Sequence, residues 1–265
     1  MDEQTVGFNT EKAFIECFSL SLHFSKKWFK EVHLVTDLKG EQLMKKYGLT
    51  FDNINTDLET VMKDVYKGHW SLGKIYACKI QDKPFIHLDN DAILFKPLPE
   101  SFLNSEIGFQ NIETEEQEQW YKLLLTHAEE NYKTKPVWFD GTDFKAYNCG
   151  IMAFNKFDII YEWWDEALKY IDYLDNSGFN YDHHLSCLIY EQFAIYHLCK
   201  HRSYNVDLLS FYGRPEQRDL GFLPNDLAAK LGYTHLIATC KRNPKIELKI
   251  RERLKKEKIK IKWLK

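Results

Sequence analysis

The sequence lacks long hydrophobic runs, paired cysteines, internal repeats and low-complexity linkers. No stretch of about 18 uncharged apolar residues occurs, and the chain opens Met-Asp-Glu-Gln instead of with a basic and then apolar signal segment. The six cysteines stand singly, with no CxxC pair, so we expect free thiols in a reducing compartment and no zinc site. These absences predict a cytoplasmic protein, and a basic C-terminal tail adds the inner face of the membrane as a second location.

The 265 residues, 44% of them hydrophobic, suffice for one large domain with a full core. Charge is unevenly spread, because Lys245 to Lys265 carries ten basic and three acidic residues, or +7, against −3 for the whole chain, which leaves −10 for the rest. We therefore divide the chain into a domain of residues 1–242 and a basic amphipathic tail of residues 243–265. The tail favours an anionic partner such as a phospholipid surface, with an ordinary solvated helix as the alternative. The acidic body argues against nucleic acid.

Helical and strand-like patterns alternate over the first hundred residues. This alternation predicts an α/β fold of the Rossmann-like kind: one domain with an open mixed, mainly parallel sheet and helices on both faces. Ligands of such sheets bind beyond the carboxyl ends of the strands. The predicted helices are 10–29, 41–47 and 71–81, and the predicted strands are 32–36, 51–55, 84–88 and 92–95.

The second half continues with a strand at 146–155 and helices at 158–174 and 181–200. Residues 113–132 are acidic, polar and weakly apolar, which predicts a helical insertion or lid on the surface.

An acidic triplet, Asp89-Asn90-Asp91, interrupts two strand-like runs. Two aspartates separated by one residue lie about 6 to 7 Å apart along an extended backbone, so one hard cation can reach both. A divalent ion held there can bridge to diphosphate oxygens and neutralise the charge that grows on a leaving group. The alternative is an exposed acidic turn.

The run FIHLDNDAILFKPL resembles the strand-DxD-strand core of GT-A glycosyltransferases, in particular the retaining glycogenin and lipooligosaccharide-galactosyltransferase family. That family has a late HxxGxxKPW motif, and His235 to Lys241 keeps its offset from histidine to lysine, with Ala238 in place of the glycine and Arg242-Asn243 in place of Pro-Trp. The resemblance implies that Asp89, Asp91 and His235 bind the metal. It also implies that Lys241 contacts the donor phosphates. Carboxylates with an imidazole favour Mn²⁺, with Mg²⁺ as the alternative.

The same resemblance extends from about Val32 to Arg242 and implies further donor contacts. Tyr147 to Met152 resembles the family's FNxGVM strand, so Asn148 and Gly150 would face the transferred sugar. Trp70 and Lys74 lie where the family has a basic residue near the donor. By analogy, Thr36 and Asp37 would contact the base or ribose, and Asn90 would lie against the donor within the triplet.

Sugar transfer also needs a polar group at the reacting carbon or a base at the acceptor hydroxyl. Glu191 and Gln192 lie within a predicted helix, where a buried carboxylate is costly unless it is paired or faces a cavity. Asp182, at the start of that helix, is the other candidate. An outward-facing, solvated Glu191-Gln192 pair is the alternative interpretation.

Together these features predict a metal-dependent glycosyltransferase that moves a sugar from a nucleotide diphosphate sugar such as a UDP-hexose to a glycan or lipid-linked acceptor. Retention of configuration at the sugar is favoured over inversion. Two other classes stay open. A haloacid-dehalogenase-type phosphatase also uses DxD at a strand end, but Ile93 stands where that family has a small hydroxylated residue. A non-catalytic nucleotide-sugar-binding module is the other.

Overall fold

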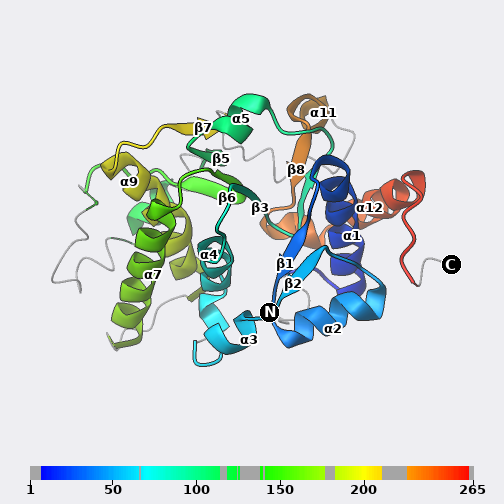
Figure 1. Ribbon diagram of the computed structural model, residues 1–265, viewed down its shortest axis with the longest axis horizontal. Helices are drawn as coiled ribbons and strands as arrows, with labels where there is room; N and C mark the ends of the chain where they lie inside the picture. The colour runs from blue at the N-terminus through cyan, green and yellow to red at the C-terminus, as the bar shows by residue number, and fades with distance from the viewer. Residues whose placement is uncertain are drawn as a thin grey trace. The chain divides into compact units, whose positions relative to one another are not determined.

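The computed structural model describes residues 7–65, 67–113, 118–123, 125, 138–139, 141–176, 183–210 and 226–262. The chain forms two compact units (Figure 1). Unit 1 comprises Met1–Thr60, Leu88–Leu98 and Arg214–Lys265, and unit 2 comprises Val61–His87 and Pro99–Gly213. Each unit is described by itself.

Unit 1 is built on two short sheets and two long helices. Strands β1 (His33–Val35) and β2 (Asn53–Asn55) pair in parallel, and β4 (Ala92–Leu94) and β8 (Tyr233–His235) pair antiparallel. Thr10 caps α1, because its side chain accepts a hydrogen bond from the Ala13 N–H. The helices are α1 (Glu11–Trp28), α2 (Leu38–Tyr47), α11 (Asp226–Leu231) and α12 (Pro244–Lys256), with the 3₁₀ turn η3 (Ala238–Arg242) before α12; the short α3 (Leu58–Val61) follows β2.

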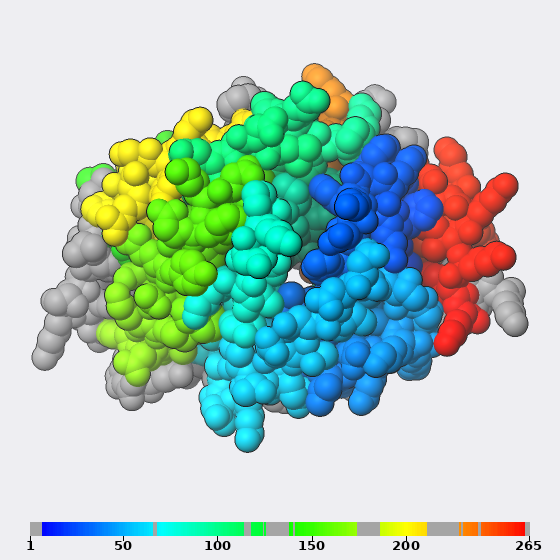
Figure 2. All heavy atoms as spheres, viewed as in Figure 1, coloured from blue at the N-terminus to red at the C-terminus, as the bar shows by residue number. Residues whose placement is uncertain are grey.

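Helix α12 packs against α1, and the two are neighbours in the ribbon and on the surface (Figures 1 and 2). Its apolar side recurs every four residues at Ile246, Ile250 and Leu254, all buried in the core of unit 1. The Arg251 guanidinium donates to the buried Glu16 carboxylate on α1 at 2.7 Å. The segment that the sequence sets apart as a tail therefore contributes its apolar face to this core.

Unit 2 holds the largest sheet, whose strand order is β3-β6-β5-β7. Strand β6 runs antiparallel to β5, and β7 runs parallel to β5. The strands are β3 (Phe85–Leu88), β5 (Ile107–Ile112), β6 (Tyr147–Phe154) and β7 (Val206–Leu208); the helices are α4 (Leu72–Lys79), α5 (Glu100–Asn104), α7 (Asp158–Asn176), α8 (His183–Leu188) and α9 (Ala194–His201), with a 3₁₀ turn η1 (Lys67–His69).

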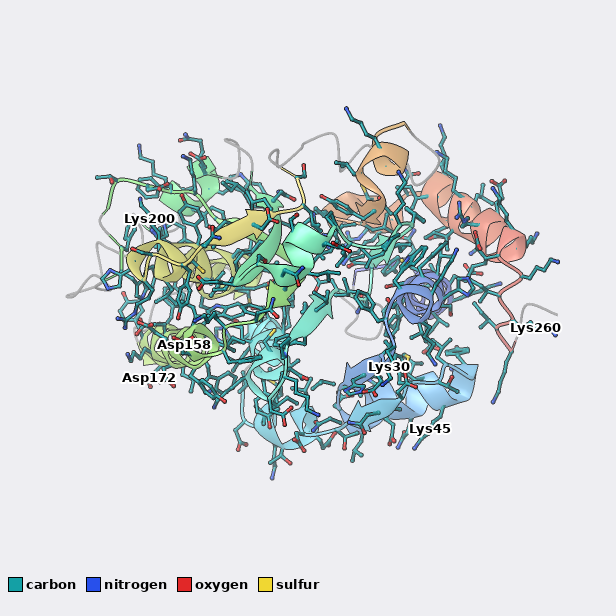
Figure 3. The ribbon with its side chains drawn as sticks, turned by 45° about the horizontal axis from the view of Figure 1, so that its top comes forward. Lys30, Lys45, Asp158, Asp172, Lys200 and Lys260 are labelled. Atoms are coloured by element: carbon teal, nitrogen blue, oxygen red, sulfur yellow. The ribbon has the colours of Figure 1, made fainter. Side chains whose placement is uncertain are left out.

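All eight residues of β6 are buried, and α7 packs against both α4 and α9. Asp158 and Asp172, labelled in Figure 3, mark the course of α7. Between α8 and α9 the chain forms one π-helical turn, η2 (Ile189–Phe193). Such turns are rare and often occur at functional sites. The helix predicted at 181–200 is thus present from residue 183 but contains this wider turn.

The mixed α/β class is confirmed, but the single, mainly parallel sheet is wrong for the described residues. The described residues form three separate sheets, and the largest contains both parallel and antiparallel pairs. The reason is that strands pair with partners far away in the sequence. The two runs that flank the acidic triplet do not continue as one sheet, since β3 pairs with β6 whereas β4 pairs with β8.

The surface insertion predicted at 113–132 is described only in part. Residues 118–123 are helical, yet Tyr121 and Leu125 are buried in the core of unit 2. The interpretation as a purely surface segment is therefore wrong at these two residues. The many acidic residues around them made the segment look polar in the sequence. None of the helices that the structure describes is long and apolar enough to cross a membrane.

Candidate functional site

Backbone pairing in unit 1 brings His235 next to the acidic triplet. Strands β4 and β8 are antiparallel, with Ala92 opposite His235, and the Leu236 N–H donates to the Asp91 carbonyl at 3.1 Å. Helix α1 holds β4 from another side, because the Ser21 hydroxyl donates to the Ala92 carbonyl at 2.6 Å. The ligand candidates are therefore placed by regular structure in unit 1.

The side chains of Asp89, Asp91 and His235 converge on one point. One ligand atom from each lies within 4.8 Å of the others. His235 Nε2 is 3.3 Å from Asp91 Oδ1 and 3.7 Å from Asp89 Oδ2. Asp91 and His235 are 2% and 9% exposed, whereas Asp89 is 23% exposed, so the group opens toward solvent on the Asp89 side.

Lys241 completes the group from η3, with Nζ 2.5 Å from Asp91 Oδ2. Burial raises the pKa of Asp91, but the Lys241 ammonium and the His235 imidazole outweigh it and hold that pKa below its usual value. Burial likewise lowers the pKa of Lys241, but the Asp91 carboxylate outweighs it and raises the pKa. Both shifts favour the charged pair, which balances two close carboxylates with one cation.

These residues fit a divalent metal. Ligand atoms on one ion at metal–ligand distances of about 2.1 Å lie about 3 to 4 Å apart, as the imidazole and carboxylate atoms do here. Two carboxylates and one imidazole form a donor set that suits Mn²⁺ and tolerates Mg²⁺. Burying the Asp91 carboxylate requires a positive partner, and Lys241 supplies one.

The other predicted donor residues of unit 1 have local partners or remain untested. Asp37 Oδ1 accepts from the Gly40 N–H at 2.6 Å and caps α2. The Thr36 N–H donates to the Asn55 carbonyl, at the shared carboxyl end of β1 and β2. Asn90 lies in the turn of the triplet, partly exposed. Contacts of Thr36, Asp37 and Asn90 with a base, ribose or phosphate stay predictions.

In unit 2 the structure brings Lys74 and Glu191 together. Lys74 Nζ lies 2.5 Å from Glu191 Oε1 and 3.4 Å from the Cys149 carbonyl. The Lys74 and Glu191 side chains are only 10% and 1% exposed. The solvated alternative for Glu191 is wrong, because this carboxylate is buried and paired with the lysine of α4.

Three further hydrogen bonds organise predicted residues of unit 2. The Asn148 side chain donates to Glu113 Oε1 at 3.0 Å and accepts from the Gly150 N–H at 3.0 Å. The Tyr121 hydroxyl donates to Gln192 Oε1 at 2.6 Å. Burial, with the Glu113 carboxylate nearby, raises the pKa of Tyr121 well above its usual value, so the hydroxyl keeps its proton.

Glu113 and Tyr121 were missed as site residues, because both fall in the segment interpreted as a surface insertion. Only their contacts with Asn148 and Gln192 identify them. Trp70 is 47% exposed, so it is not a core residue, and its donor contact stays a prediction. Asp182 lies outside the described residues.

All six cysteines are free and buried, which confirms the predicted free thiols. The only group of histidine, cysteine, aspartate and glutamate side chains with metal-ligand geometry in the described part of the chain is the one formed by Asp89, Asp91 and His235.

Comparison with known proteins gives one family assignment. No curated protein and no solved structure shows a significant match to the sequence. A family of unknown function, DUF6734, matches residues 1–261, nearly the whole chain. The chain therefore belongs to the family of unknown function DUF6734.

Proposed function

We propose that this protein is a metal-dependent glycosyltransferase of the GT-A type, which transfers a hexose from a UDP-sugar or related nucleotide sugar. The observation that carries the proposal is the convergence of Asp89, Asp91 and His235, with Lys241 against Asp91. The resemblance of the sequence assigned metal binding to the first three and phosphate binding to the fourth. The same four side chains, from segments about 150 residues apart in the chain, meet in unit 1.

Bound Mn²⁺ or Mg²⁺ would neutralise charge on the diphosphate leaving group. Asp89, Asp91 and His235 would hold the ion. The pairing of β4 with β8 would keep Asp91 and His235 in place. Lys241 would provide a further positive charge for phosphate oxygens. An acidic turn that served only solubility would not bury Asp91 beside an imidazole and an ammonium group.

Glu191 and Gln192 are proposed to act at the transferred sugar, with Lys74, Asn148 and Gly150 as donor contacts. Their support is the polar network inside unit 2, since a Glu that is 1% exposed and paired with Lys needs a reason beyond stability. A carboxylate already paired with an ammonium group is a poor base for an acceptor hydroxyl. This favours retention of configuration over inversion.

For the acceptor we propose a glycan or lipid-linked molecule, used in the cytoplasm or at the inner face of the membrane. Contact with an anionic bilayer would depend on exposed lysines at the end of α12, because the apolar face of that helix is buried. Lys260, labelled in Figure 3, lies in the segment after α12. Nucleic acid is not proposed as a partner.

Thermal unfolding with UDP-, GDP- and CDP-sugars, each with and without Mn²⁺, tests the donor class. Ligand at 100 times its dissociation constant stabilises a protein by about 2.7 kcal/mol, which shifts the melting temperature measurably. We expect a Mn²⁺-dependent shift with one nucleotide. Release of that nucleotide from its sugar, followed chromatographically, then separates a transferase from a binding module. Release of inorganic phosphate from phosphate esters, with no nucleotide-sugar effect, would instead support the phosphatase alternative.

A further inference from the structure

The Asp91 carboxylate is divided between two partners. Its Oδ1 faces His235 Nε2 at 3.3 Å, and its Oδ2 faces Lys241 Nζ at 2.5 Å. A metal held with His235 and Asp89 reaches Oδ1, whereas Oδ2 is engaged by the ammonium group. Asp91 can then offer one oxygen to the ion but not both.

Lys241 is held in this position by its surroundings. Its Nζ lies 5.7 Å from the centroid of the buried Phe8 ring, and its Cδ would be 3.5 Å from a Cβ added at Gly7. Its side chain is 18% exposed. The stem is thus packed along the Gly7-Phe8 segment, so the ammonium group has little freedom to leave Asp91.

We propose that Lys241 is a selectivity residue that restricts Asp91 to monodentate coordination and so disfavours Ca²⁺ against Mn²⁺ and Mg²⁺. Ca²⁺ takes six to eight oxygen ligands and commonly binds carboxylates through both oxygens, whereas Mg²⁺ requires near-octahedral geometry with single contacts. With Oδ2 engaged, Asp91 offers one oxygen and His235 one nitrogen beside the Asp89 carboxylate, a poorer set for Ca²⁺ than one in which Asp91 also binds through both oxygens. This inference rests on the metal centre of the proposed function.

The role differs from simple charge repulsion. Removing any nearby positive charge strengthens binding of all divalent ions by similar factors, since they carry the same charge. Removing the group that engages Oδ2 also adds an oxygen ligand, which benefits Ca²⁺ most. The ratio of two affinities therefore separates the two effects.

The test is titration of the purified full chain with MnCl₂, MgCl₂ and CaCl₂ alone, without nucleotide, by calorimetry. Wild-type protein is compared with Lys241→Met, Lys241→Arg and Lys245→Met. The arginine variant keeps a cation at the position, and Lys245→Met removes one exposed positive charge from the start of α12. Lys241→Gln replaces Lys241→Met if circular dichroism shows that the latter does not fold.

We expect the Ca²⁺ to Mn²⁺ affinity ratio to rise about tenfold in Lys241→Met, the size of effect typical of residues that orient metal ligands. Lys241→Arg and Lys245→Met should keep the wild-type ratio. Equal gains for all three ions in Lys241→Met would overturn the selectivity role and leave the proposed function intact. Failure of the wild-type protein to bind any of the ions would overturn both.

Discussion

The buried pair Lys74–Glu191 in unit 2 allows a stability prediction that needs no substrate. The perturbation is a double-mutant cycle of Lys74→Met, Glu191→Met and the double variant, because methionine is similar in length to both side chains and carries no charge. Each single variant leaves one buried charge without the partner that lies 2.5 Å away.

Breaking a buried ion pair by removing one member costs about 3–5 kcal/mol, whereas replacing both members by apolar residues is often neutral or stabilising. The side chains are 10% and 1% exposed, so solvent screens this pair little. We therefore expect each single variant to lose about 3 kcal/mol of unfolding free energy. The double variant should lose less than either, giving a coupling of at least about 3 kcal/mol.

Urea unfolding followed by tryptophan fluorescence and circular dichroism measures these values. The exposed Lys83→Met and Glu100→Met, made singly and together, provide a control cycle in unit 2, for which additive losses are expected. A double variant of Lys74 and Glu191 that loses as much unfolding free energy as the two single variants added together would refute the claim that the two charges stabilise one another.

Four further predictions concern other parts of the chain. Asp143→Asn should cost about 1 kcal/mol of unfolding free energy at pH 7. Burial raises the pKa of Asp143, but hydrogen bonds from Lys200, the Lys145 N–H and Tyr196 outweigh burial and lower it, so the stabilisation is present above the unfolded pKa and is lost as pH falls through the folded pKa. Urea midpoints of wild type and variant that differ equally at pH 3 and pH 7 would contradict this. Ile250→Ala should cost about 2–5 kcal/mol, because Ile250 is 1% exposed in the core of unit 1, whereas the exposed Leu248→Ala should change the melting temperature little. A thiol reagent should modify none of the six cysteines in the folded protein and all six in denaturant; rapid labelling of the native protein would show that their burial is incomplete. Flotation with anionic vesicles should weaken when Lys255, Lys256, Lys258 and Lys260 are changed together to Gln, and unchanged recovery would remove membrane contact from the proposal.

The sequence predicted that Asp89 and Asp91 follow a hydrophobic strand, and the two residues stand directly after β3. The sequence predicted His235 and Lys241 as site residues only because their spacing matches a motif of the glycosyltransferase family that the chain resembles. The physical reason that these two meet Asp91 is the antiparallel β4–β8 pair, and neither its register nor its three-residue length leaves a periodic signal.

In the other unit, local patterns predicted β6 and α7 but could not show which strand pairs with which, so the parallel sheet was wrong. Glu191 lies within a π turn, which apolar spacing in the sequence does not reveal. Glu113 was hidden in the same way, since an acidic segment gives no sign that one of its carboxylates is buried beside Asn148.

The central claim is that Asp89, Asp91 and His235 hold one divalent cation. Titration with Mn²⁺, followed by the electron paramagnetic resonance signal of the free ion, measures this directly. The account predicts one tight equivalent in the wild-type protein, strengthened by UDP, and its loss in Asp89→Asn and in His235→Gln that circular dichroism shows to be folded. Binding of one Mn²⁺ with wild-type affinity in both variants would contradict it.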